Sequence, residues 1–189
     1  MSDPKRPAVI YLSPHGNESV TCDPELLRQA LKYRMDKQLM KPEDFYRNIT
    51  VWKFVHKDGT IEYYPRENDS DEMGFEKAVQ IRKDKGMGSR DARKDAGAYP
   101  TNSGIHSEVN VVAEIYRRPD ISQGLTRIEQ AFTEREPCYG CRTFMRRMFP
   151  PVLHTPFFFY LPSSRTERNF RTKPYGGNVM LYLLSRYGA

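Results

Sequence analysis

The stretch that most constrains the fold is residues 48–65, NITVWKFVHKDGTIEYYP. Two runs rich in β-branched and aromatic residues flank Lys57, Asp58 and Gly59, which are turn residues. This composition is typical of two antiparallel strands joined by a tight turn. The sequence therefore predicts a β-hairpin here, and the hairpin gives an antiparallel pair to any sheet that it joins.

Helices and further strands are predicted on both sides of the hairpin. Asp23 and Pro24 have the residue types of an N-cap and a first helical position, and Lys41-Pro42 should stop the helix that they begin. Residues 71–86 should form a second helix, and Gly86 to Ile105 a long loop. The buried face of the first helix is expected to carry Leu26, Leu27, Ala30, Leu31 and Met35.

The second half of the chain continues this alternation. The patterns predict a helix over residues 106–118, a strand over 127–134, a helix over 138–149 and a buried strand over 155–162. An apolar last element over residues 178–188 is either strand or helix. Strands that alternate with helices predict an α/β fold with a helix-flanked sheet, and the hairpin makes that sheet mixed.

The length of 189 residues fits a single domain over residues 1–189. Residues 1–22 are expected to be irregular, with a short strand at residues 8–12, and residues 66–105 to form a variable insertion and a loop. No apolar run is long enough to span a bilayer, and no apolar N-terminal segment marks a secretory signal. A membrane is therefore not an expected partner.

Two short motifs carry residues with metal-binding chemistry. Residues 106–108 read HSE and residues 136–141 read EPCYGC, each at the predicted start of a helix. One imidazole and two thiolates match the three protein ligands of a catalytic zinc site, which keeps a fourth position for water. A helix N-terminus favours thiolate over thiol. Glu108 would then reach the water as a proton shuttle instead of binding the metal.

The CxxC motif by itself has other interpretations. A redox pair is one, but it needs the first strand-helix junction of a βαβ unit and leaves the HSE motif unexplained. A structural zinc site with His15 or Cys22 is another, although these residues lack zinc-finger spacing and Cys22 is expected to be a lone packed thiol. Three cysteines in all, a low and odd number, do not suit a disulfide scaffold.

With Pro137 directly before the first cysteine, the two motifs resemble the signature H-x-E…P-C-x-x-C of the zinc-dependent nucleobase deaminases. The resemblance covers residues 23–161 in element order. It implies a cytidine-deaminase-like mixed sheet of about five strands flanked by helices, with the zinc site at the N-termini of the two motif helices. Among the subfamilies, the bacterial toxin-type deaminases are the most similar.

The resemblance implies a function for each motif residue. His106, Cys138 and Cys141 would bind Zn²⁺, and Glu108 would move protons while an activated water attacks C4 of cytosine to give uracil. Attack on C6 of adenine, which gives inosine, is the alternative. Serine at position 107 departs from the alanine that the family often has there, and this leaves the mechanism intact.

Three residues are implied near the substrate base. Ser107 and the loop residue Asn102 would line the pocket. Tyr139, between the two cysteines, would either stack on a base or cover the metal. Both interpretations of Tyr139 stay open on the sequence.

Basic residues gather at and after the CxxC motif. The formal net charge of +6 permits a polyanionic partner. A solvated face is the ordinary explanation of such residues, and phosphate contact is the functional one. The candidates for phosphate contact are Arg142, Arg146, Arg147, Arg165 and Arg168.

The sequence thus predicts a zinc-dependent hydrolase that deaminates cytosine in single-stranded nucleic acid. A free nucleoside or nucleotide deaminase is the second hypothesis, and a non-catalytic zinc-containing nucleic-acid-binding module is the third. If the similarity to toxin-type deaminases holds, we expect an immunity protein as partner and delivery into a target cell by a specialised secretion route. Otherwise we expect a cytoplasmic protein.

Overall fold

A computed structural model describes most of the chain, in eight ranges. These are residues 7–11, 20–41, 47–67, 71–98, 114–115, 118–137, 139–149 and 152–160. The strands are β1 (Ala8–Ile10), β2 (Ile49–His56), β3 (Ile61–Glu67), β4 (Thr126–Thr133) and β5 (Phe157–Phe159). The helices are α1 (Pro24–Asp36), α2 (Asp71–Asp84), α3 (Ser89–Ala98), α5 (Pro119–Ser122) and α6 (Tyr139–Met148). The predicted last element, residues 178–188, lies outside these ranges.

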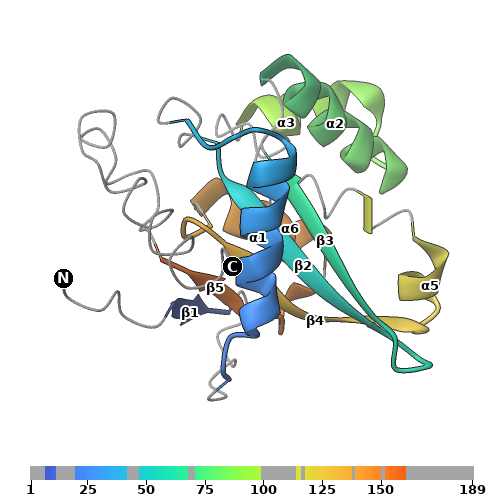
Figure 1. Cartoon of the computed structure of the whole chain (residues 1–189). Helices are drawn as coiled ribbons and strands as arrows, with labels where there is room; N and C mark the ends of the chain where they lie inside the picture. The colour runs from blue at the N-terminus through green and yellow to red at the C-terminus, as the bar shows by residue number, and fades with distance from the viewer. Residues whose placement is uncertain are drawn as a thin grey trace.

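The five strands form one mixed sheet in the order β1-β5-β4-β2-β3 (Figure 1). β2 pairs antiparallel with both β3 and β4, and β1 pairs antiparallel with β5. β4 and β5 run parallel and are joined by the crossover that contains α6. The predicted α/β fold with a five-stranded mixed sheet flanked by helices is therefore confirmed. None of the helices in the described ranges is long and apolar enough to cross a membrane.

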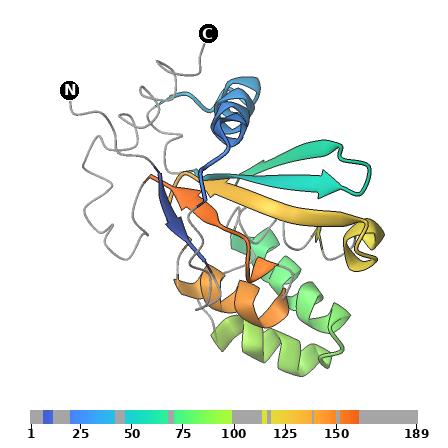
Figure 2. The same ribbon diagram turned by 90° about the horizontal axis from the view of Figure 1, so that it is seen from below.

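Helices lie against both faces of the sheet, with α1 on one side and α2, α3 and α6 on the other (Figure 2). Successive residues of a strand point to opposite faces. In β2, Val51 accordingly joins the apolar cluster beneath α1, whereas Trp52 and Phe54 join the cluster beneath α6. In β4, Phe132 joins the cluster beneath α1, and Ala131 joins the cluster beneath α6. The sheet thus separates two cores.

Helix α1 begins as predicted but ends earlier. The Asp23 side chain accepts a hydrogen bond from the Glu25 N–H at 2.9 Å, as an N-cap does. The helix ends at Asp36, well before Lys41, because Gln38 adopts a left-handed conformation with φ of 56°. Met35 was expected on the buried face and is exposed instead, while the neighbouring Arg34 is buried.

Helix α3 occupies the stretch for which the sequence predicts a loop between Gly86 and Ile105. Ala92 and Ala96, one helical turn apart, are buried against Val79 of α2. Alanine has the highest helix propensity, and this pair gives the segment one apolar face that outweighs its glycines. The long-loop prediction is therefore wrong for residues 89–98, and residues 99–105 lie outside the described part of the chain.

A buried ion pair joins three parts of the fold. Arg34 Nε and Nη2 donate to the two carboxylate oxygens of Glu134 at 2.6 and 2.7 Å, and the side chains are only 2% and 7% exposed. Arg34 also donates to the carbonyl oxygens of Leu39 and Arg47, and Glu134 accepts the Ile49 N–H at 3.0 Å. The pair therefore ties the end of α1 to the start of β2 and the end of β4.

Replacing Glu134 by glutamine should destabilise the protein by about 3 kcal/mol, because the buried Arg34 charge would lose its counterion. Urea unfolding at pH 7 measures this change. The matched control is Asp36→Asn, which breaks the exposed Lys32–Asp36 pair and should cost less than about 0.5 kcal/mol. Equal effects of the two substitutions would contradict a structural function of the buried pair.

Candidate functional site

The CxxC motif lies at the junction between β4 and α6. β4 ends at Thr133, α6 begins at Tyr139, and the chain returns through α6 to β5, which is parallel to β4. In such α/β units, ligands bind beyond the carboxyl ends of the strands, where the helix N-termini also point. The position of the motif in the fold is therefore one where a site is expected.

Polar contacts fix the chain on its way into the motif. Asn48 Nδ2 donates to Thr133 Oγ1 at 2.8 Å, and Asn48 Oδ1 accepts the Arg135 N–H at 3.1 Å. Arg142 Nη1 lies 3.2 Å from Glu136 Oε1, so the first turn of α6 is tied back to the junction. Together with the buried ion pair, these contacts hold residues 133–136 against β2 and α6.

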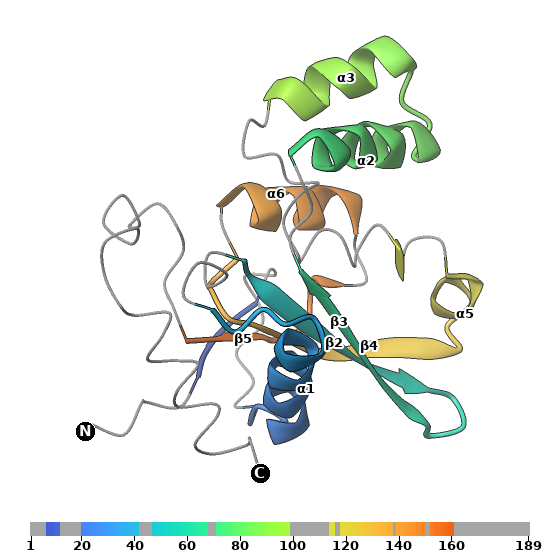
Figure 3. The ribbon, with the colours of Figure 1, turned by 45° about the horizontal axis from the view of Figure 1, so that its top comes forward.

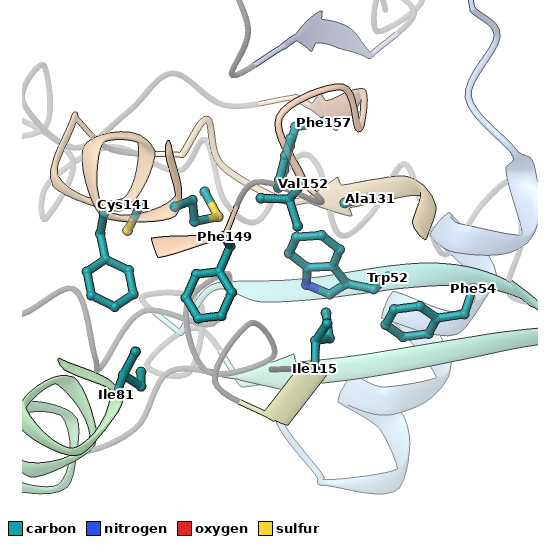
Figure 4. Close-up of a cluster of buried hydrophobic side chains, with 11 residues drawn as sticks. Trp52, Phe54, Ile81, Ile115, Ala131, Cys141, Phe149, Val152 and Phe157 are labelled. Atoms are coloured by element: carbon teal, nitrogen blue, oxygen red, sulfur yellow. The ribbon is translucent and has the colours of Figure 1, made fainter. Parts of the chain in front are cut away.

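Cys141 is the predicted zinc ligand that falls within the described residues. It lies in the first turn of α6 and is fully buried, in one cluster with Trp52, Phe144 and Met145 (Figure 4). The helix N-terminus favours its thiolate, whereas the apolar surroundings favour its thiol. This burial fits a packed thiol, and it fits equally a thiolate whose charge a bound cation neutralises.

The other half of the predicted site falls outside the described part of the chain. The residues concerned are Asn102, His106, Ser107, Glu108, Cys138, Arg165 and Arg168. Within the described ranges, no three His, Cys, Asp or Glu side chains form a group that could hold a metal ion. The predicted zinc set therefore stays a prediction.

The helix predicted to begin at HSE is described only at its far end. Glu114 and Ile115 are helical, and Ile115 is buried in the same cluster as Cys141. Glu114 accepts hydrogen bonds from the Tyr64 hydroxyl and from Arg66 Nη2, the latter at 2.9 Å. Burial alone would raise the pKa of Glu114, but these hydrogen bonds outweigh it and hold the pKa below its usual value. Glu114 thus fastens this segment to β3, a contact that the sequence did not indicate.

A buried polar atom in the same cluster, the indole donor Trp52 Nε1, has no hydrogen-bond partner among the described residues. Thr155 Oγ1, just before β5, is another buried atom of this kind. Trp52 meets Phe157 edge-on, with ring centroids 5.2 Å apart. Because most buried polar groups are paired, such atoms mark places where a ligand or a water can bind. Trp52 lies on the side of the sheet that α6 covers.

The described arginines of the predicted phosphate-binding set differ in their surroundings. Arg142 is half-buried and paired with Glu136, whereas Arg146 and Arg147 are exposed. Arg147 Nη1 lies 3.5 Å from Asp95 Oδ1 of α3. Tyr139 is 60% exposed at the start of the same helix. The outer face of α6 thus carries an aromatic ring and two cations.

Cys22 lies on the opposite side of the sheet from Cys141. It packs at the start of α1, against the cluster that contains Val51 and Phe132. Burial, and to a smaller extent the charge of Asp23, raise the pKa of the Cys22 thiol to about 12. Since the sheet separates the two cysteines, a structural zinc site shared by Cys22 and Cys141 is excluded. The alternative with His15 concerns a residue outside the described ranges.

Native Cys22 should react with iodoacetamide at pH 8 more than about 100-fold slower than in the urea-unfolded chain, because its thiolate is scarce at this pKa. Peptide mass spectrometry after timed alkylation measures both rates. Removing metal with a chelator should leave the Cys22 rate unchanged. Faster labelling of Cys22 after chelation would contradict its placement away from the CxxC motif.

Comparison with known proteins found no matching family model, no matching curated protein and no matching solved structure.

Proposed function

We propose that the chain is a zinc-dependent hydrolase that deaminates cytosine to uracil in single-stranded nucleic acid. The observation that supports this most strongly is the convergence of the segments that carry the two motifs. Cys141 lies in the first turn of α6, and Ile115, nine residues after His106, is buried in the same cluster. A mixed five-stranded sheet with helices on both faces is also what the deaminase resemblance implies.

The donor set suits zinc. His106, Cys138 and Cys141 would supply one imidazole and two thiolates, which are ligands that zinc prefers, and would leave one position open. The N-terminus of α6 would stabilise negative charge on such sulfur ligands. The contacts that hold residues 133–136 would fix the direction in which the two cysteines enter the site.

Zinc, when bound, supplies a water that loses a proton near neutral pH and can add to C4 of the base. Glu108 would accept that proton and donate it to N3 of the ring, and would then carry a proton to the departing ammonia. The base must be unstacked to reach this carboxylate, so a single strand is the favoured substrate. The place of the chain among toxin-type deaminases stays a prediction.

Replacing Glu108 by alanine should leave the fold and the zinc content intact and lower ammonia release by at least about 100-fold, because the proton shuttle is lost. Ammonia release and C-to-T sequencing after incubation with single-stranded DNA, duplex DNA, RNA and cytidine measure the loss and identify the substrate. Mass spectrometry for metals measures the zinc content. The matched control is Asp36→Asn, an exposed carboxylate of α1 on the other face of the sheet. Unchanged turnover in Glu108→Ala would refute the mechanism.

A further inference from the structure

Helices α2 and α3 form a helical hairpin on the outer side of α6, so that α6 lies between this hairpin and the sheet (Figure 3). Ile81 of α2 is buried in the α6 cluster, and α3 packs on α2 through Ala92 and Ala96. The segment that the sequence identifies as a variable insertion is therefore a second helical layer over the helix of the CxxC motif.

Charged contacts join the three helices. Arg82 of α2 is only 2% exposed, donates to Asp95 Oδ2 of α3 at 2.6 Å, and lies 5.0 Å from the ring centroid of Phe144 in α6. Arg147 of α6 approaches the other oxygen of Asp95. Burial alone would raise the pKa of Asp95, but the hydrogen bond and charge of Arg82 and the charge of Arg147 outweigh it, so its pKa lies below the usual value. Asp95 is thus anionic at neutral pH and holds α3 beside α6.

The three helices differ in charge. Residues 71–98, which contain α2 and α3, have seven Lys or Arg and six Asp or Glu. Residues 139–149, which contain α6, have three Arg and no acid. The positive charge of this layer therefore lies mainly on α6, and α3 adds to it through cations that share one face.

On α3, the cations face outward. Arg90 and Lys94 are exposed and one helical turn apart, on the side opposite to the buried Ala92 and Ala96. On α6, Tyr139 and Arg146 are exposed on the side opposite to the buried Cys141 and Met145. The contact between Arg147 and Asp95 joins α6 to α3, so the helices that carry these two outward faces are neighbours.

We propose that the outward faces of α3 and α6 form a binding surface for single-stranded nucleic acid. Arg90, Lys94 and Arg146 contact backbone phosphates, and Tyr139 stacks on an unpaired base beside the CxxC motif. This inference rests on the proposed function, which supplies the chemistry at the CxxC motif beside the surface. It adds that the helical insertion is the part of the chain that recognises the nucleic acid strand.

The features of the surface favour a single strand over other polyanions. A row of cations alone would suit the phosphates of a duplex as well. An exposed aromatic ring among the cations favours a single strand, because the ring can stack on an unpaired base. Anionic membranes are bound by helices that add large apolar side chains to their cations. Among the side chains of α2, α3 and α6 whose exposure the structure describes, Tyr139 is the one exposed large hydrophobic residue.

The charge test compares two double variants in a Glu108→Ala background, so that binding is measured without turnover. Arg90→Gln/Lys94→Gln removes two cations from α3, and Lys32→Gln/Lys37→Gln removes two exposed cations from the region of α1 on the other face. Fluorescence anisotropy with a labelled cytosine-containing single strand should show about 10-fold weaker binding for the α3 variant. The slope of the logarithm of the association constant against the logarithm of the salt concentration is negative, and for that variant it should become shallower by about 1.4. This corresponds to two lost phosphate contacts at about 0.7 each. The α1 variant should stay within about twofold of its parent.

The stacking test replaces Tyr139. Tyr139→Ala should weaken single-strand binding about 10-fold and leave duplex binding unchanged, whereas Tyr139→Phe, which keeps the ring, should bind like its parent. Equal losses for the α3 and α1 variants would overturn the proposed surface, and so would tighter binding to anionic phospholipid vesicles than to the single strand.

The outcomes separate this surface from the proposed chemistry. If the α3 and Tyr139 variants lose binding as expected but the native chain releases no ammonia from any substrate, the surface stands and the deaminase proposal falls. If the native chain deaminates cytosine and the α3 variant binds the single strand like its parent, the chemistry stands and the surface falls.

Discussion

The buried pair of Arg34 and Glu134 is the contact on which the candidate site depends. Desolvation of two buried charges offsets most of their attraction, so such a pair contributes little net stability compared with apolar packing. The pair instead fixes the position of the chain segments that it joins. Both carboxylate oxygens of Glu134 and most of the guanidinium donors of Arg34 have a defined partner. Glu134 follows β4 directly and lies four residues before Cys138. A pair that can form in only one arrangement therefore fixes where the chain leaves the sheet towards the CxxC motif.

The two faces of the sheet serve different purposes. On the α1 face, Lys53 lies 2.8 Å from Asp23 and 2.7 Å from Glu129, so that the N-cap of α1 is bound to β2 and β4. Burial opposes the charge of Lys53, but hydrogen bonds and attraction to these two carboxylates outweigh it and raise its pKa. This face is closed by ion pairs and apolar packing. The opposite face holds Cys141, the Trp52 nitrogen, which has no hydrogen-bond partner among the described residues, and the end of the segment that follows the HSE motif.

Local signals were readable in the sequence, and long-range ones were not. The cap at Asp23, the turn at Gly59 and the strand of β4 each depend on neighbouring residues, and all three are confirmed. The early end of α1 comes from the left-handed Gln38, where no Gly or Asn signals a helix end, and α3 depends on packing against α2, so neither was predictable from local pattern. In the candidate site, both motifs are contiguous and visible as sequence. The residues that support the CxxC motif, such as Asn48 and Asp95, are separated from it by tens of residues and carry no local signature.

The position of the insertion links recognition of a polymer to the proposed chemistry. α2 and α3 lie in the chain between β3 and the HSE motif, and in space they lie over the helix of the CxxC motif. Extruding a base from a strand costs a few kcal/mol, which contacts away from the reacting atoms must offset. Phosphate contacts on α3 and stacking on Tyr139 would supply such energy at the edge of the site without touching the base that reacts. A free nucleoside would reach none of these groups, so on the proposed function the insertion would favour a strand over a free nucleoside as substrate.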